Sequence, residues 1–266
     1  MDLELTGKRA IVTGGSRGIG KAVARGLARE GARVAIVARH AEALTATAAE
    51  LALETGAEII PLACDTAVDG DVAAMVANVI RQFGGVDILV NGAGQTSGGA
   101  PSPKLGEITD EVFWSDLNVK VMGYLRCIRE VAPHMARHGG GRIVNIGGLA
   151  ARYTGSAIRS MRNVAVASMT KNLADELGPV GISVCVVHPG AVRTEGTMAA
   201  LGRRAARENV SLEEMERRSS QPYALGRMVD SAEVAAVIVF LASPRAIAIN
   251  GDAVVTSGGA LGWIYY

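Results

Sequence analysis

The sequence predicts an α/β fold in which a parallel sheet of about seven strands is covered by helices on both faces. Short runs of β-branched residues alternate with alanine-rich segments whose apolar residues recur three and four positions apart. Glycines such as Gly31 and Gly56 stand where these helical segments should end. No linker or repeat interrupts the alternation, so residues 1–266 are predicted to form a single domain.

The expected elements follow one another along the whole chain. The predicted strands are Arg9–Thr13, Val34–Ala38, Glu58–Leu62, Val86–Asn91, Arg142–Ile146, Ile182–Val187 and Ala253–Thr256. Most are apolar throughout, as strands covered on both faces are. The helices between them include two long ones, near Glu111–Arg137 and Ser156–Leu177. A later helix begins with a capping-box pattern at Asp230 and runs to Leu241.

The alternation breaks after Pro189-Gly190, where residues 194–221 are polar, arginine-rich and weakly periodic. Ligands of open parallel sheets bind beyond the carboxyl ends of the strands. This insertion is therefore predicted to be either a lid over the substrate or a solvated helical hairpin on the surface. Both interpretations stay open.

Composition excludes several classes of partner. Lys and Arg number 27 against 26 Asp and Glu, without the basic excess typical of proteins that bind nucleic acid or anionic membranes. No apolar run approaches the roughly 18 residues of a membrane span. The three cysteines lack metal-ligand spacing, so no metal site is expected. The chain begins with acidic residues that lead into a strand, and we expect a cytoplasmic protein.

A glycine-rich segment, Thr13–Gly20, directly follows the first strand and opens a helix. One glycine permits the tight turn, another lets backbone approach a pyrophosphate, and a third lets helix and strand pack closely. The helix N-terminus then offers free N–H groups to the phosphates. The segment predicts a dinucleotide site formed by Gly14, Ser16, Arg17, Gly18, Ile19 and Gly20.

Further motifs stand at the ends of later strands. They are Asp65-Thr66, Asn91-Gly92-Ala93-Gly94, the mid-helix Asn118 and Pro189–Thr194. With the glycine-rich loop they make the chain resemble the short-chain dehydrogenase/reductase family from about Leu5 to Gly259. One departure is Gly92, where the family has asparagine.

The resemblance implies a Rossmann-type doubly wound sheet that binds a nicotinamide cofactor. It implies that Asp65 and Thr66 hold the adenine and that the segment from Pro189 to Thr194 contacts the nicotinamide. Asn91, Ala93 and Gly94 belong to the cofactor site on the same ground.

Arg39 at the end of the second strand indicates which dinucleotide is preferred. Relatives that prefer NAD carry an acidic residue at the position of Ala38, where it binds the ribose 2′-hydroxyl. Alanine removes that acceptor, and Arg39 offers a charge-assisted pair to a 2′-phosphate, with Arg17 as a second cation. The sequence favours NADP over NAD; the alternative is that Arg39 is only a solvated charge.

The expected catalytic residues are replaced. In the family a tyrosine protonates the substrate carbonyl, a lysine four residues later lowers the pKa of that tyrosine and holds the ribose, and a serine binds the carbonyl. The resemblance places Arg159, Asn163 and Gly148 at these positions. Arginine stays protonated and is a poor acid, while asparagine supplies no charge. Asn118 corresponds to the family's water-organising asparagine.

Other groups are candidates for the missing proton donor. Tyr153 lies in a loop at the correct end of the sheet and is either catalytic or a packing residue. Ser156 is better explained as a helix N-cap, and His188 as a structural hydrogen-bonding residue. Arg159 and Arg162 are three apart, so a shared face would suit an anionic substrate.

The leading hypothesis is an NADP-dependent oxidoreductase with a non-standard site that acts on a small carbonyl or hydroxyl compound. Two alternatives stay open: a catalytically silent NADP-binding subunit or sensor, and a non-redox lyase or isomerase on the same fold. The resemblance also implies a homodimer or homotetramer assembled through the two long helices. The apolar tail after Gly259 is expected to pack on a neighbouring subunit or over the site.

Overall fold

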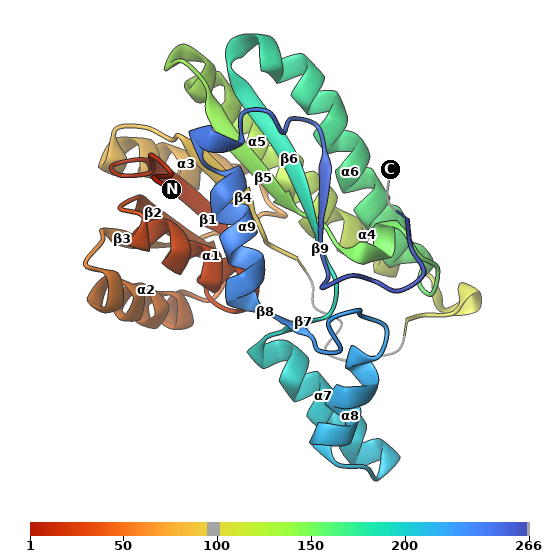
Figure 1. The fold of residues 1–266 in the computed structure, drawn as a ribbon. Helices are drawn as coiled ribbons and strands as arrows, with labels where there is room; N and C mark the ends of the chain where they lie inside the picture. Colours follow the sequence, from red (N-terminus) through yellow and green to blue (C-terminus); the bar gives the residue numbers. More distant parts are fainter. Residues whose placement is uncertain (95–101, 265–266) are drawn as a thin grey trace.

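Seven short apolar segments pair as one parallel sheet in the computed structural model of the protein, which describes residues 1–94 and 102–264 (Figure 1). The strands are β1 (Arg9–Thr13), β2 (Arg33–Ala38), β3 (Ile59–Ala63), β4 (Ile88–Asn91), β5 (Gly141–Ile146), β6 (Ile182–Pro189) and β9 (Ala253–Thr256). Their spatial order is β3-β2-β1-β4-β5-β6-β9. The predicted doubly wound sheet is confirmed, with strand ends shifted by one or two residues from those expected.

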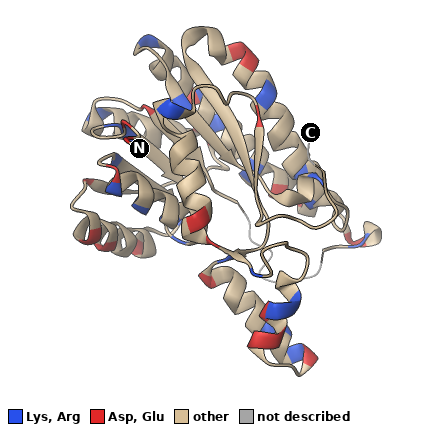
Figure 2. Ribbon diagram, viewed as in Figure 1, with Lys and Arg blue, Asp and Glu red and all other residues tan. Residues whose placement is uncertain are grey.

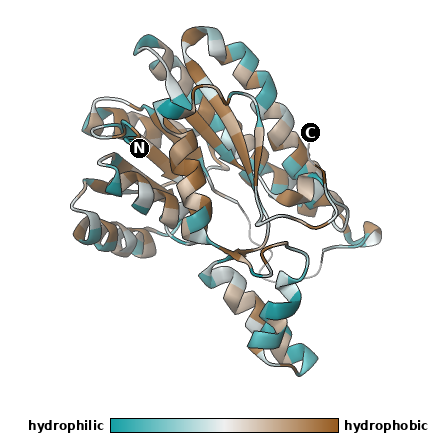
Figure 3. Ribbon diagram, viewed as in Figure 1, coloured by the Kyte–Doolittle hydropathy of each residue, from teal (hydrophilic) through white to brown (hydrophobic). Residues whose placement is uncertain are grey.

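Helices cover both faces of this sheet. One face carries α1 (Gly18–Arg29), α2 (Ala41–Thr55) and α9 (Ser231–Leu241), and the other carries α3 (Asp69–Phe83), α5 (Gly123–Arg137) and α6 (Ala157–Leu177) (Figure 1). Successive strand residues point to opposite faces, so Ala10 and Val12 join the core beneath α1 and α9. Ile11 joins the core beneath α3 and α5. The hydrophobic colouring of the strands in Figure 3 reflects burial on both sides.

The predicted long helix Glu111–Arg137 is wrong as a continuous α-helix. The structure divides it into α4 (Asp110–Leu117), a π-helical turn over Asn118–Met122 and α5. A π-turn accommodates one additional residue within the helical path, so it rotates the side chains that follow relative to a regular α-helix. The turn itself contains neither proline nor glycine, and only Gly123, where α5 begins, stands at the interruption.

The segment predicted as an insertion is a helical hairpin, α7 (Glu195–Glu208) and α8 (Leu212–Ser220). It leaves the sheet through β7 (Val192–Arg193) and returns through β8 (Val229–Asp230), at the bottom of Figure 1. Its own small apolar cluster consists of Leu201, Ala205, Met215 and Met228. Both signs of charge cover its outer surface (Figure 2). Among the described residues, no helix combines the length and apolarity that a bilayer crossing needs.

Candidate active site

The glycine-rich loop turns sharply between β1 and α1. Gly14 and Gly18 have positive φ angles of 71° and 54°, which residues with a Cβ rarely adopt. A Cβ on Gly20 would lie only 2.2 Å from the Gly14 carbonyl oxygen. Glycine at this position therefore lets α1 begin directly at the end of β1, where its first N–H groups are placed for a pyrophosphate.

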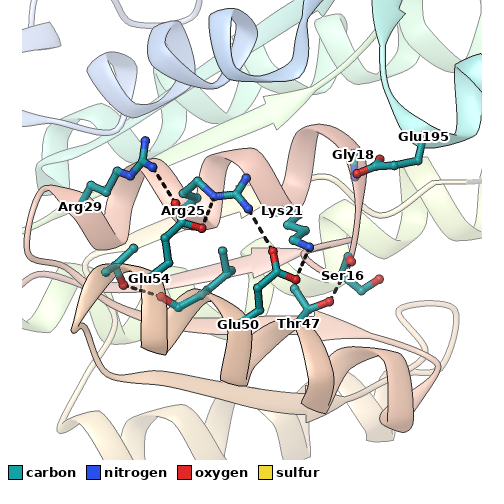
Figure 4. A network of polar contacts seen from close by, with 11 residues as sticks. Ser16, Gly18, Lys21, Arg25, Arg29, Thr47, Glu50, Glu54 and Glu195 are labelled. Carbon is teal, nitrogen blue, oxygen red and sulfur yellow. Dashed lines mark hydrogen bonds and ion pairs between the residues drawn. The ribbon is translucent and has the colours of Figure 1, made fainter.

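Contacts with α2 and with the hydrophobic core fix the rest of the loop. The Thr47 hydroxyl donates to the Ser16 carbonyl at 3.1 Å, and Ile19 packs against the core beneath α1. Lys21 pairs with Glu50 at 2.7 Å and Arg25 with Glu54 at 2.9 Å, which joins α1 to α2 (Figure 4). These contacts keep the helix that bears the loop in place.

A carboxylate already lies at the N-terminus of α1. Gly18 N–H donates to Glu195 Oε2 at 3.2 Å (Figure 4). Glu195 is the first residue of α7, and the preceding Thr194 caps that helix by accepting from Thr197 N–H. The end of α1 therefore binds an anionic group in this structure, as the predicted phosphate site requires. Thr194 is close to the loop, as expected, and Pro189 ends β6.

Thr13 joins the ends of β1 and β4. Its buried hydroxyl accepts from the N–H groups of Gly92 and Ala93 at 3.0 and 3.2 Å. A Cβ on Gly92 would lie 2.7 Å from the Thr13 carbonyl oxygen. This close approach accounts physically for a glycine at the position where the family has asparagine. Gly94 follows in the same loop.

Buried amides fix the neighbouring strands. Asn91 Nδ2 donates to Asn145 Oδ1 at 3.0 Å, and Asn145 Nδ2 donates to the Thr170 hydroxyl at 3.0 Å. This chain of hydrogen bonds links β4, β5 and α6 inside the core. Because unpaired buried polar groups are costly, it holds these three elements in one relative position.

The predicted adenine and ribose residues lie beyond β2 and β3. The Asp65 carboxylate accepts from Ala67 N–H at 3.0 Å, and Thr66 is buried. Arg39 directly follows β2 and is exposed, as is Arg17. Within residues 1–94 and 102–264, neither guanidinium has a hydrogen-bond or ion-pair partner. Both are therefore available to a phosphorylated ligand.

A second group of polar residues surrounds the dipeptide Gly147-Gly148 at the end of β5. Gly148 N–H donates to His188 Nδ1 at 3.1 Å, and Lys120 Nζ donates to the Gly147 carbonyl at 2.7 Å. Burial, together with smaller contributions from Arg152 and Lys120, lowers the pKa of His188 to about 4. His188 is neutral at physiological pH and acts as a fixed acceptor, which confirms the structural role expected for it.

Asn163 reaches the same dipeptide from α6. It is only 3% exposed, and a Cβ on Gly148 would lie 3.0 Å from its Nδ2. Its Oδ1 is buried and has no hydrogen-bond partner in the described residues. Positions 148 and 163 are thus brought together as predicted. Ser156 caps α6 by accepting from Arg159 N–H at 3.4 Å, also as predicted, and this places Arg159 in the first turn of the helix.

Arg162 and Tyr153 each have a partner within the chain. Arg162 forms an ion pair with Asp116 of α4, so it neither faces solvent nor stands free beside Arg159. Tyr153 is 47% exposed, and its ring packs edge-on against Trp263 at 5.4 Å between centroids. The tail therefore packs over the loop that precedes α6. Tyr265 and Tyr266 lie outside the described residues.

Lys120 reaches the end of β5 from the π-turn, where its Nζ donates to the Gly147 carbonyl. The Asn118 carbonyl accepts from Arg126 Nη1 at 3.2 Å, and the same guanidinium nitrogen also donates to Thr66 O. Sequence reasoning overlooked Lys120, although it is the only charged residue between Asp116 and Arg126. The described residues contain no cluster of three or more His, Cys, Asp or Glu side chains placed to hold a metal ion.

Comparison with known proteins settles the family. The family model described as enoyl-(acyl carrier protein) reductase matches residues 14–260. A putative ketoacyl reductase of Streptomyces coelicolor is 37% identical over 256 residues, which cover 94% of this chain and 95% of that protein. This chain belongs to the short-chain dehydrogenase/reductase family. It is an oxidoreductase of the NAD(P)-dependent type that this family comprises.

Other members of the short-chain dehydrogenase/reductase family extend the likeness. The short-chain reductase protein NovJ of Streptomyces niveus is 36% identical over 94% of this chain and 92% of its own length. L-Sorbose reductase from Gluconobacter frateurii, solved with NADPH and L-sorbose, superposes with a TM-score of 0.94 at 31% identity. That match covers 99% of this chain and 100% of the other.

Replacing Gly20 by alanine tests the close approach of helix and strand. The added methyl group collides with the Gly14 carbonyl, so we expect a loss of about 1–3 kcal/mol in unfolding free energy and loss of NADPH binding. Gly70→Ala is the control, because a Cβ there meets nothing within 4 Å. Thermal melting and calorimetric titration provide the measurements. Unchanged NADPH binding in Gly20→Ala would contradict the geometry described.

Replacing Glu195 by glutamine tests the anion site on α1. The carboxylate competes with the pyrophosphate for a helix N-terminus, an interaction worth about 0.3–1 kcal/mol. We expect NADPH to bind roughly two- to fivefold more tightly to Glu195→Gln. Glu213→Gln, which removes the same charge from α8, should leave the affinity unchanged. Weaker binding in Glu195→Gln would instead indicate that the carboxylate assists the cofactor.

Proposed function

We propose that this protein is an NADPH-dependent ketone reductase whose proton-transfer site differs from the serine–tyrosine–lysine site of its family. The observation that carries the proposal is the dinucleotide cradle, in which the positive-φ loop precedes the anion-binding N-terminus of α1. Gly14 and Gly15 of this loop donate to the Val37 carbonyl, two residues before the exposed Arg39. The residues present fit the cofactor, because glycines keep the loop open and Gly18 N–H already binds a carboxylate.

Arg39 and Ala38 support NADP over NAD. Ala38 ends β2 and provides no carboxylate for a ribose hydroxyl, while Arg39, at the same edge, provides a guanidinium without a partner among the described residues. Guanidinium groups form strong, charge-assisted hydrogen bonds with phosphate. L-Sorbose reductase from Gluconobacter frateurii, to which this chain is similar, likewise was solved with NADPH bound.

Relatives support a ketone as the substrate. A ketoacyl reductase and a reductase solved with the keto sugar L-sorbose both match along nearly their whole length. We place the ketone beside Gly147-Gly148, since Asn163 and Lys120 also reach this dipeptide. Arg159, in the first turn of α6, is suited to a carboxylate or to negative charge on the substrate oxygen.

The cofactor, when bound, supplies the hydride. The protein orients it through the loop of α1 and the first turn of α7, and Asn163 offers an amide to the nicotinamide ribose. Asn118 and Tyr153 stay candidates for a role beside the substrate, as water organiser and as proton donor. Tyr153 is less well suited, because its ring packs on Trp263.

A substrate panel tests the proposed reaction. Purified protein is mixed with NADPH and, in turn, L-sorbose, an acetoacetyl thioester and a 2-keto acid, and the loss of absorbance of the reduced nicotinamide is followed. We expect at least one ketone to be reduced, with NADPH preferred over NADH. Tight NADPH binding with no turnover of any ketone would reject a reductase of these substrates.

A second candidate function is that of a cofactor-binding subunit that catalyses no reaction. It is favoured by Arg159 and Asn163 at the positions that the resemblance assigns to the tyrosine and lysine. A partner-dependent response to NADPH without substrate conversion would select this candidate. Substrate conversion without any change in nicotinamide absorbance would select a lyase or isomerase instead.

Assembly through α4 and α6 is part of the proposal. These helices expose large apolar side chains, namely Val112, Trp114, Met161 and Val164. Such side chains gathered on neighbouring helices suit a contact between subunits. Sedimentation of the purified protein should show a dimer or tetramer.

Replacing Arg39 by alanine tests the preference for the phosphorylated cofactor. A charge-assisted hydrogen bond is worth about 1.5–3 kcal/mol, and solvent reduces it at this exposed position. We therefore expect the dissociation constant of NADPH to rise roughly tenfold and that of NADH to stay the same. Arg81→Ala on α3 removes an exposed arginine elsewhere and serves as the control. An equal effect on both cofactors would contradict the assignment.

A further inference from the structure

Lys120 is a lysine enclosed by the core at the end of the sheet. It is 8% exposed and lies in the π-turn between α4 and α5. Its Cδ would lie 3.8 Å from a Cβ placed on Gly94, and its Nζ donates to the Gly147 carbonyl at 2.7 Å. The side chain thus passes the loop after β4 and reaches the end of β5, the edge at which ligands of such sheets bind.

The immediate surroundings do not satisfy this lysine as a structural ion. An ammonium has three N–H donors, and the described residues provide one acceptor, the Gly147 carbonyl. The nearby carboxylate of Asp116 is already paired with Arg162. Burying a charge without its own counter-ion is costly. A group retained at such a cost is a candidate for function.

Charged and titratable groups act on Lys120 from three sides. Arg162 comes from α6, Asp116 from α4 and His188 from β6, beside Arg152. Burial is the largest influence and Arg162 adds to it, while Asp116 opposes both, so that the pKa of Lys120 is lowered to about 7. The side chain can therefore both release and recover a proton near neutral pH.

Asn163 approaches the same dipeptide from the opposite helix. Lys120 binds Gly147 O, and Asn163 Nδ2 lies against Gly148. The Oδ1 of Asn163 is buried without a partner in the described residues, so it can accept a hydrogen bond from a bound ligand. Compared with the family pattern, the amide stands on α6 and the ammonium stands on the π-turn. A cation is thus kept in the site but enters it from the other side.

Tyr124 is also a buried acid beside this site, but it is not suited to donate the proton. The Tyr124 hydroxyl donates to the Ile146 carbonyl at 3.0 Å, and burial raises its pKa far above the usual value. Its hydrogen bond and high pKa make it a poor proton donor near pH 7. His188 is an acceptor held by Gly148 N–H.

We propose that Lys120 is the proton donor to the substrate oxygen, in place of the tyrosine–lysine pair of the family. This inference rests on the proposed reductase function. A hydride leaves the reduced nicotinamide with its electron pair and forms a C–H bond at the carbonyl carbon. One N–H bond of the Lys120 ammonium breaks, and its proton forms the O–H bond of the alcohol. The cofactor is oxidised, the ketone is reduced, and the resulting amine takes a proton from water.

Single-turnover reduction tests the role of Lys120. Enzyme saturated with NADPH is mixed with L-sorbose or an acetoacetyl thioester at a series of pH values. The wild-type rate should fall as pH rises through about 7, because the ammonium form is the acid. Lys120→Met should lower the rate about 10²–10⁴-fold and leave the dissociation constant of NADPH within about threefold.

Lys120→Arg separates proton donation from the mere presence of charge. Arginine keeps the cation but does not release its proton, so the donor role predicts a rate as low as that of Lys120→Met and no fall near pH 7. A rate within tenfold of wild type in either variant would overturn the proposal. The control is Lys171→Met, whose exposed lysine pairs with Asp175 on α6 and whose loss should change nothing.

Lysine NMR provides a readout that does not need turnover. In protein labelled with ¹³C at the lysine side chains, the signal lost in Lys120→Met identifies Lys120. We expect this signal to titrate near pH 7 and to shift when NADPH is added. A signal unmoved by NADPH, or one that titrates near the ordinary lysine value, would overturn the proposal even in an active reductase. A responsive signal in a protein that reduces no ketone would instead reject the proposed function, and the donor role with it.

If Lys120→Met does not fold, Lys120→Gln keeps a donor for the Gly147 carbonyl and takes its place in both measurements. The same loss of rate is expected, because a neutral amide has no proton to give near pH 7. A glutamine variant as fast as wild type would reduce Lys120 to a structural hydrogen-bond donor.

Discussion

The hydrogen bonds that the loop after β4 donates to the Thr13 hydroxyl are the constraint on which the site depends. In the order β3-β2-β1-β4-β5-β6-β9, the chain reverses its direction of strand addition between β1 and β4. Thr13 ends β1 and accepts from the N–H groups of Gly92 and Ala93 at that reversal. The two glycine-containing loops are thereby held together at the edge where such sheets bind ligands.

Two sets of groups lie at this edge of the sheet. Backbone groups of the loop and of α1 form an anion site that needs no charged side chain, since its N–H groups and helix dipole attract phosphate. Side chains at the end of β5 form the second set, in which Lys120 and Asn163 flank Gly147-Gly148. The second set has an amide on α6 and an ammonium on the π-turn.

The helical hairpin of α7 and α8 contacts the start of α1 through Glu195. Thr194 and Glu195 start α7 beside Gly18, so the phosphate site and the hairpin share a contact. The hairpin has its own apolar cluster around Met215, so α7 and α8 are packed together independently of that contact. This arrangement fits the interpretation of residues 194–221 as a lid.

The sequence by itself determined the sheet, the dinucleotide loop and the hydrogen-bonding roles of Ser156 and His188. The sheet, the loop and the N-cap at Ser156 depend on neighbours in the chain or on a period of two or 3.6 residues, which spacing reveals; the partner of His188, Gly148, lies 40 residues away and came only with the fold. The tertiary structure decided the rest. Arg162 pairs with Asp116, 46 residues away, and Lys120 turns inward because a π-turn alters the helical phase. Neither the distant partner nor the changed phase leaves a periodic signal in the sequence, so packing alone brings the buried lysine to the end of β5.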